Sequence, residues 1–214
     1  MKNQPLLLSL IFNLLFTVVL ILIGWKQRED ITRWYLRKTH SAQIAMLGGS
    51  HTEIPNWNEL LNRKDVLEVA GYGYTTEQIL SYVKDIDAHN TPKVCFFLGG
   101  TNDVLSPKYD SSYTLSNYRL IADEIRQRNV TPVFQTVPYL LDQTALNNRI
   151  DSLNLQLKRF CQNQKIDLID LNSLLARQHN LSVNLQHDGE HLNEEGYEVW
   201  AAALNDYLEH HDIR

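Results

Sequence analysis

The hydrophobic pattern begins with a long apolar segment. Leu6 to Ile23 is an 18-residue run that only three polar residues interrupt. With the next two residues it reaches the roughly 20 residues that a helix needs to cross a bilayer. A cleaved signal peptide is the alternative, but the run is long and no small-residue cleavage pattern follows it. The pattern therefore predicts an uncleaved N-terminal membrane anchor over Leu6 to Trp25.

From residue 43 onward, short apolar runs alternate with longer segments of helical period. The runs have strand length: Ile44 to Leu47, Val66 to Ala70, Lys93 to Leu98, Pro132 to Val137 and Ile166 to Leu171. The helical segments follow them: Thr75 to Ile86, Leu115 to Arg128, Asn147 to Gln164 and Glu194 to Leu208. Strands that alternate with helices form parallel sheets through crossover connections. We expect a three-layer α/β/α sandwich around a five-stranded parallel sheet.

Charge is distributed unevenly along the chain. The 214 residues carry a formal net charge of -5. Residues 1–25 carry only Lys2, a charge of +1, and residues 26–38 hold five basic and two acidic side chains, a net +3, which leaves -9 for residues 39–214. An acidic body repels a phosphate backbone, so we expect no nucleic-acid partner. The two cysteines, Cys95 and Cys161, stand in apolar or helical segments and predict buried thiols rather than metal ligands.

These patterns predict three regions. Residues 1–25 form the membrane anchor, residues 26–42 a basic juxtamembrane helix or linker, and residues 43–214 one α/β domain. The basic residues after the span favour a cytoplasmic location for that domain by the positive-inside rule, and a secreted-side location stays open. The sequence contains no indication of the oligomeric state.

Glycine-rich loops follow the first three predicted strands. They contain Gly48-Gly49-Ser50, Gly71-Tyr72-Gly73 and Gly99-Gly100-Thr101-Asn102. Ligands bind at the carboxyl ends of the strands in open parallel sheets, so these loops face one crevice. Each loop alone is equally typical of an ordinary turn or, for Ser50, of a phosphate-binding loop. Tyr72, Tyr74 and Pro138 to Thr144 are candidate pocket walls.

An Asp-x-x-His pattern precedes the last predicted helix. Asp188 can turn back to hold one nitrogen of the His191 ring and leave the other nitrogen as a base. Metal binding by His187, Asp188 and His191 is the competing interpretation. Four other histidines have no evident partner in the sequence and are assigned to the surface or to loops: His40, His51, His89 and His179.

Four segments together resemble the blocks of the SGNH/GDSL hydrolase superfamily. They are AMLGGSHTE around Ser50, VAGYGYTTEQIL around Gly73, FFLGGTNDV around Asn102 and DGEHLNEEGY around His191. The resemblance extends from about Ile44 to Leu208 and is greatest to the lysophospholipase-like and platelet-activating-factor-acetylhydrolase-like branch. It implies a flavodoxin-like fold and a serine esterase that acts on lysophospholipid, acetyl or other short acyl esters. It implies no cofactor and no metal.

The resemblance also implies residue roles. Ser50 would be the nucleophile, His191 the general base and Asp188 its orienting carboxylate, and Ser50, Gly73 and Asn102 would form the oxyanion hole. The family usually has Asp where this chain has Gly49. Three alternatives stay open: an acyl or acetyl transferase with the same triad, an inactive membrane-tethered binding module, and a phosphate-binding domain.

Overall fold

The computed structural model describes residues 12–14, 16–18, 41–86 and 92–213. The chain divides into two compact units, Met1–His40 and Ser41–Arg214. In the first unit residues 12–14 and 16–18 are helical, and the hydroxyl of Thr17 donates to the carbonyl oxygen of Asn13 at 2.8 Å. No helix among the described residues is long and apolar enough to cross a membrane. The rest of the predicted anchor, and residues 26–40 of the basic segment, lie outside the described residues.

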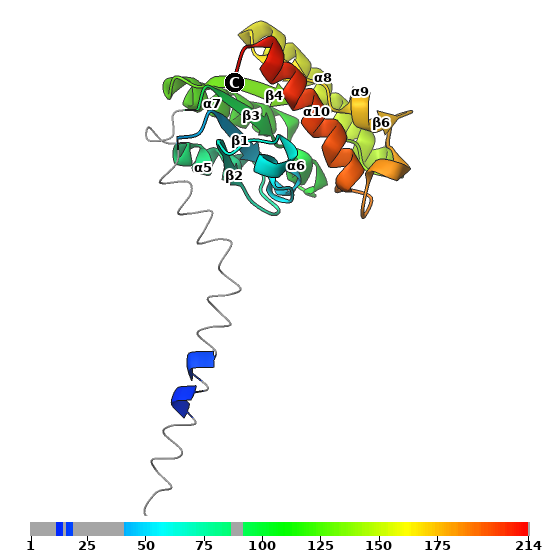
Figure 1. Cartoon of the computed structure of the whole chain (residues 1–214). Coiled ribbons are helices and arrows are strands. Elements are labelled where there is room, and N and C mark those ends of the chain that lie inside the picture. The colour runs from blue at the N-terminus through cyan, green and yellow to red at the C-terminus, as the bar shows by residue number, and fades with distance from the viewer. Residues whose placement is uncertain (1–11, 15, 19–40, 87–91, 214) are drawn as a thin grey trace, which may run out of the picture. The chain divides into compact units, whose positions relative to one another are not determined.

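The second unit is built on a five-stranded parallel sheet (Figure 1). Its order is β2-β1-β3-β4-β5, with every neighbouring pair parallel. The strands are β1 (Ile44–Gly48), β2 (Val66–Ala70), β3 (Val94–Leu98), β4 (Thr131–Gln135) and β5 (Asp167–Ile169). The five predicted strands and their parallel arrangement are confirmed.

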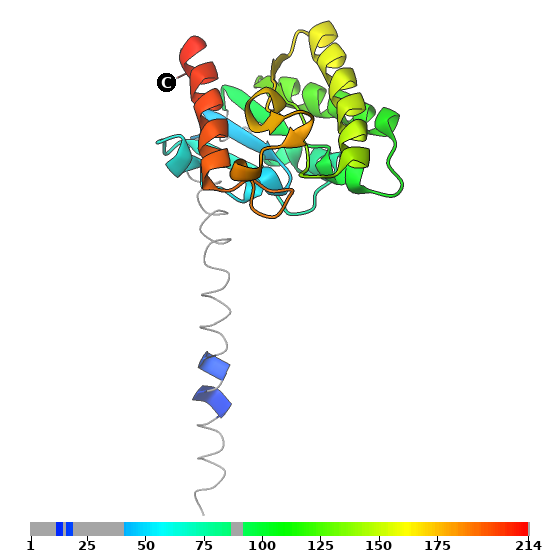
Figure 2. The ribbon, with the colours of Figure 1, turned by 90° about the vertical axis from the view of Figure 1, so that its right-hand side faces the viewer.

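Helices cover both faces of the sheet and complete the three layers. In Figure 2, α10 lies on one side of the sheet and α8 on the other. The longer helices are α5 (Thr76–Tyr82), which continues as η1 (Val83–Asp85), α7 (Ser111–Gln127), α8 (Thr144–Gln164) and α10 (Glu194–His210). The shorter ones are α3 (Ser50–Glu53), α4 (Trp57–Leu60), α6 (Thr101–Leu105), α9 (Asn172–Leu175) and η2 (Val183–Leu185).

Alternate side chains of the central strands enter two separate cores. In β1, Ala45 and Leu47 belong to the core under α5, α7 and α8, whereas Ile44 and Met46 belong to the core under α4, α9 and α10. All four side chains are fully buried. Successive residues of a strand point to opposite faces, so a strand covered on both sides needs an unbroken apolar run. This is why the strands could be recognised in the sequence.

The structure contains elements that the hydrophobic pattern did not predict. The four short α-helices have only 4 or 5 residues, and β6 (Ala176–Arg177) pairs with β7 (Asn180–Leu181) in an antiparallel hairpin. Such elements are too short to show a period. Strand β4 ends before the predicted Val137 because the N–H of that residue donates to the side chain of Asn154, at 2.9 Å, instead of to a neighbouring strand.

The packing around the end of β1 predicts that Gly48 and Gly49 differ in how well they tolerate replacement by alanine. A Cβ at Gly48 would lie 2.5 Å from the carbonyl oxygen of Leu98, whereas a Cβ at Gly49 would come no closer than 3.4 Å to the carbonyl oxygen of Tyr74. We expect Gly48→Ala to lower the free energy of unfolding by about 1–3 kcal/mol. Gly49→Ala, the matched control, should change it by about 0.5 kcal/mol or less. Urea denaturation of both variants measures this, and equal stabilities would contradict the steric argument.

Candidate active site

The carboxyl end of β1 positions Ser50. The strand ends at Gly48, and Gly49 turns the chain so that Ser50 becomes the first residue of α3. The turn is closed by backbone hydrogen bonds from Thr52 and Glu53 to the carbonyl of Gly49, both 3.0 Å. The Ser50 side chain is thereby held at the edge of the sheet where the loops after β2 and β3 also begin.

Asp188 and His191 lie in one turn before α10. One oxygen of the Asp188 carboxylate accepts hydrogen bonds from the backbone N–H groups of Glu190, at 3.0 Å, and His191, at 2.8 Å. The other oxygen lies 2.8 Å from Nδ1 of His191. Gly189 has a φ of 92°, a conformation that L side chains rarely adopt. The turn thus folds the carboxylate back onto the ring three residues later.

The structure joins this turn to Ser50. Nε2 of His191 lies 2.9 Å from the hydroxyl oxygen of Ser50. An ionised carboxylate only accepts hydrogen bonds, so Nδ1 of His191 donates to Asp188 and Nε2 is the acceptor for the Ser50 hydroxyl. Three residues that the sequence pattern selected therefore form one chain of hydrogen bonds that can move a proton away from an oxygen nucleophile.

The electrostatic environment keeps Asp188 ionised. Partial burial acts to raise the pKa of Asp188, but hydrogen bonds from the His191 ring and from the two backbone N–H groups outweigh it. The net effect lowers the pKa of Asp188 below its usual range. An ionised Asp188 stabilises a positive charge on the neighbouring imidazole.

The remaining residues of the predicted site lie on the two adjacent loops. Gly73 has a φ of 72°, and no other residue would contact a Cβ placed there. The amide nitrogen of Asn102 donates to the carbonyl of Tyr74 at 3.2 Å, and a Cβ at Gly49 would lie 3.6 Å from that nitrogen. The loops that carry Ser50, Gly73 and Asn102 therefore meet at one place, with one amide hydrogen of Asn102 not used by Tyr74.

Asp103 fastens the Asn102 loop to the neighbouring helices. This carboxylate is buried and accepts hydrogen bonds from the backbone N–H of Thr76, at 2.9 Å, and from the hydroxyls of Thr76 and Thr114, at 2.5 and 3.3 Å. The amide of Asn117 donates to the Thr76 hydroxyl at 3.0 Å. The Asp after Asn102 thus joins α6 to α5 and α7 and does not simply cap its own helix.

Two clefts border the Asp188–His191 turn. One, of about 670 Å³, is lined by Asp188, Gly189 and Glu190 together with apolar side chains, Leu105, Leu140, Leu141 and Leu146. The other, of about 550 Å³, is lined by His187, Asp188 and His191 together with Ile54, Tyr72, Leu192 and Tyr197. Tyr72 and part of the loop Pro138 to Thr144 therefore line clefts as predicted. Tyr74 instead stacks on Tyr82, with ring centroids 5.0 Å apart.

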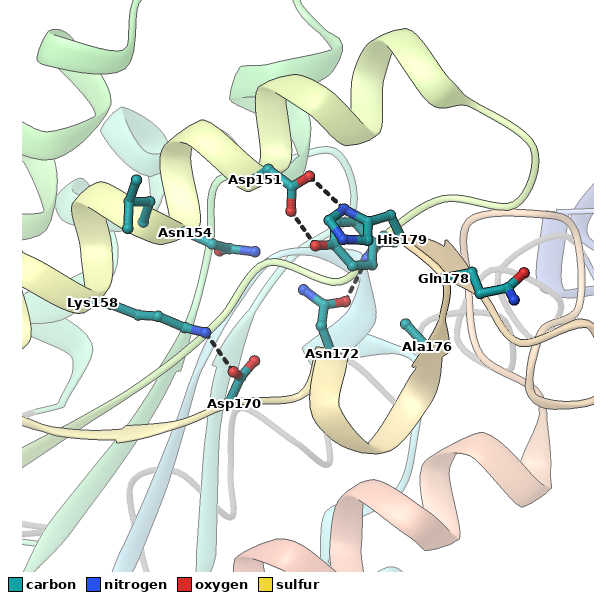
Figure 3. A pocket seen from close by; sticks show the side chains of 10 residues that line it. Asp151, Asn154, Lys158, Asp170, Asn172, Ala176, Gln178 and His179 are labelled. Atoms are coloured by element: carbon teal, nitrogen blue, oxygen red, sulfur yellow. Dashed lines mark hydrogen bonds and ion pairs between the residues drawn. The ribbon is translucent and has the colours of Figure 1, made fainter.

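A third cavity, of about 370 Å³, lies beside the end of β5 and shares no lining residue with these clefts (Figure 3). Asp151 of α8 bonds both the hydroxyl of Tyr139 and Nδ1 of His179, the latter at 2.8 Å. Lys158 and Asp170 form an ion pair across it. His179 is exposed in the turn between β6 and β7, which agrees with its assignment to the surface or a loop. The partner that the sequence did not reveal is Asp151, because the β6–β7 hairpin brings His179 against α8.

The geometry does not bring together the three residues of the competing metal site, His187, Asp188 and His191. Within the described part of the chain, the residues whose ligand atoms gather within 4.8 Å are His51, Glu190 and His191, and this group contains neither His187 nor Asp188. Nε2 of His191 is already bonded to Ser50, and Nε2 of His51 lies 3.1 Å from the carbonyl oxygen of Glu190. These two histidine nitrogens are thus already hydrogen-bonded, and the Glu190 carboxylate lies 3.9 Å from Nε2 of His191.

Comparison with known families gives the context for this geometry. The model of the GDSL-like lipase/acylhydrolase family matches residues 41–199. The chain belongs to this family. It is an SGNH-type serine hydrolase, which confirms the resemblance drawn from its four blocks.

Solved structures of family members share the fold. A GDSL-like lipase from Bacteroides thetaiotaomicron has a TM-score of 0.72 and 18% sequence identity, with 86% of this chain and 97% of that chain covered. A lipase/acylhydrolase from Enterococcus faecalis has a TM-score of 0.69 and 20% identity, with 79% and 96% covered. N-acylneuraminate cytidylyltransferase from Streptococcus agalactiae serotype III is 29% identical over 101 residues, which are 47% of this chain. The chain spans only 24% of that relative's length.

His51 was missed as a residue of the site. In this chain His51 directly follows Ser50. The assignment of His51 to the surface or a loop is wrong: the ring is 3% exposed, its centroid lies 5.2 Å from that of His191, and it bonds the Glu190 carbonyl. The available signal was its place directly after Ser50, within the block that resembles the nucleophile segment of the family. Burial, followed by the proximity of His191, lowers the pKa of His51 to about 4.

This lowered pKa predicts a loss of stability in mild acid. The unfolded chain takes up a proton on His51 as the pH falls below the ordinary pKa of 6.5, while the folded protein resists until about 4. Folding stability that His51 supports at neutral pH is therefore lost as the pH falls through this window, by about 1 kcal/mol between about pH 7.5 and 5.5. Urea denaturation at both pH values should show a smaller loss for His51→Leu than for the unchanged protein. An equal loss would contradict the assignment of this window to His51.

Proposed function

We propose that this protein is a membrane-anchored serine esterase that hydrolyses carboxylic esters with Ser50, His191 and Asp188 as its catalytic triad. The observation that carries the proposal is the unbroken hydrogen-bond chain from the Ser50 hydroxyl to Nε2 of His191, at 2.9 Å, and from Nδ1 of His191 to Asp188, at 2.8 Å. Membership of an acylhydrolase family supports an ester as the substrate.

The proposed reaction has two halves. The Ser50 oxygen attacks the ester carbonyl while His191 takes the hydroxyl proton, and the C–O bond to the alcohol breaks as His191 returns that proton to the leaving oxygen. A water molecule then gives its proton to His191 and attacks the acyl-enzyme, which releases the carboxylic acid and restores the Ser50 hydroxyl. Asp188 stabilises the imidazolium that forms in each half.

The oxyanion of each tetrahedral intermediate would be bound by the N–H groups of Ser50 and Gly73 and by the side-chain amide of Asn102. The meeting of these three loops at the end of β1 supports this assignment. Gly49 leaves the triad hydrogen bonds intact, which favours an active enzyme over an inactive binding module. Donors fixed before the reaction stabilise the developing charge without having to reorganise.

The two clefts support an acyl ester of a lipid or a short acyl chain as the substrate. The cleft beside Glu190 combines four leucines, which suit an aliphatic acyl group, with polar residues that include Asp142, Gln143 and Gln186. The cleft with Tyr72 and Tyr197 is lined by His191, the residue that would protonate the leaving alcohol. We therefore favour lysophospholipid, acetyl or other short acyl esters.

The anchor would bring the domain to a membrane that contains such esters. The apolar run Leu6 to Ile23 has the length of a span, and the described Phe12, Leu14, Phe16 and Val18 side chains are exposed. The basic residues between 26 and 38 favour contact with anionic headgroups and a cytoplasmic side.

Replacement of the proposed nucleophile tests the function. Ser50→Ala should abolish hydrolysis of p-nitrophenyl acetate and of lysophosphatidylcholine, because the variant lacks the hydroxyl that would attack the ester carbonyl. Asn102→Ala should lower kcat by about 10²–10³, the usual effect of losing one oxyanion donor. A fluorophosphonate probe should label the unchanged protein at Ser50. A folded Ser50→Ala variant that hydrolyses either ester at the original rate would refute the proposal.

Charged substitutions test the anchor. In the full chain, Phe12→Lys combined with Phe16→Lys should release the protein from carbonate-washed membranes, since each cation near the centre of a span costs about 2.5–3.5 kcal/mol. Phe12→Leu combined with Phe16→Leu is the matched control and should stay in the membrane. Recovery of both proteins in the same fraction would contradict a spanning anchor.

A further inference from the structure

His51 lies between the two segments that supply the proposed triad. It follows Ser50 directly in α3, and its ring is buried against the turn that carries Asp188 and His191. The His51 and His191 ring centroids are 5.2 Å apart with the planes tilted by 41°. His51 thus lies beside the proposed base and is almost closed to solvent, at 3% exposure.

The hydrogen bond of His51 has a defined direction. Nε2 lies 3.1 Å from the carbonyl oxygen of Glu190, and a carbonyl oxygen only accepts. Because burial keeps the imidazole neutral, the ring has a single N–H, and that hydrogen must be on Nε2. His51 is therefore the donor.

Both backbone groups of Glu190 form hydrogen bonds. The N–H of Glu190 donates to the Asp188 carboxylate at 3.0 Å, and its carbonyl accepts from His51. Glu190 immediately precedes His191, so a shift of its carbonyl would move the backbone that carries the proposed base. A leucine at position 51 would fill a similar volume but would donate no hydrogen bond, which would leave this carbonyl without the imidazole donor.

We propose that His51 is a positioning residue, whose hydrogen bond to the Glu190 carbonyl fixes His191 at hydrogen-bonding distance from Ser50. The inference rests on the proposed function and extends it to a residue outside the triad and the oxyanion hole. It gives a physical reason for a polar residue at this buried position: the same short segment carries the nucleophile and orients the base.

Two substitutions in the full chain separate donation from packing. His51→Leu retains volume without the donor, whereas His51→Gln retains an N–H donor at similar reach. We expect His51→Leu to lower kcat on p-nitrophenyl acetate by about ten- to a hundredfold with little change in KM, since small displacements of catalytic groups have effects of this size. His51→Gln should recover most of the loss. Equal losses in the two folded variants would overturn the proposal.

Repeating the substitution in a protein that lacks the proposed base distinguishes positioning of that base from a general effect on the fold. In a His191→Ala protein there is no base to orient, so adding His51→Leu should leave the residual rate unchanged. A further drop by the same factor as in the unchanged background would show that His51 acts through the fold alone and would overturn the proposal.

A measurement on the unchanged protein does not depend on the variants. ¹⁵N spectra of the histidine-labelled full chain should show His51 as the Nε2–H tautomer at neutral pH, and an Nδ1–H tautomer would overturn the proposal. Fluorophosphonate labelling is run in parallel. Absence of labelling at Ser50 would refute the proposed function and this inference with it, whereas labelling together with an unimpaired His51→Leu variant would refute only this inference.

Discussion

The parallel direction of all five strands is the constraint on which the rest of the molecule depends. A parallel sheet needs a helix between successive strands, and these helices cover both faces, so each strand ends at the same edge. The residues after β1, β2 and β3 are therefore neighbours in space although about 50 positions separate Ser50 from Asn102. The turn before α10 reaches the same edge because α10 packs along the face of the sheet that contains Ile44 and Met46.

The long elements could be predicted because the burial of their faces requires apolar residues at regular positions in the sequence. Strands covered on both faces appear as short apolar runs, and α7, α8 and α10 are long enough for a helical period to emerge. The triad candidates could be selected for a related reason: glycines and an Asp-x-x-His turn mark the strand ends where backbone geometry limits the choice of residue. The structure places His191 within hydrogen-bonding distance of both Ser50 and Asp188.

Other features depend on contacts that no local pattern contains. The partner of His51 is the backbone carbonyl of Glu190, 139 positions away. Every residue has a backbone carbonyl, so the sequence does not identify this acceptor. His179 finds Asp151 only because a hairpin of two-residue strands folds back onto α8. Asp103 joins α5 and α7 through the hydroxyls of Thr76 and Thr114, and nothing in the local sequence distinguishes these two threonines. In each case tertiary packing, rather than propensity, decides the role.

Gly49 has a consequence for the charge around the proposed oxyanion hole. Its φ of -93° is open to every amino acid, so the fold does not require glycine there. A carboxylate attached to a Cβ only 3.6 Å from the Asn102 amide would add a negative charge close to where the substrate oxygen acquires its own. This chain has no charge at that position, so the proposed oxyanion donors would act on the substrate without a competing anion from residue 49.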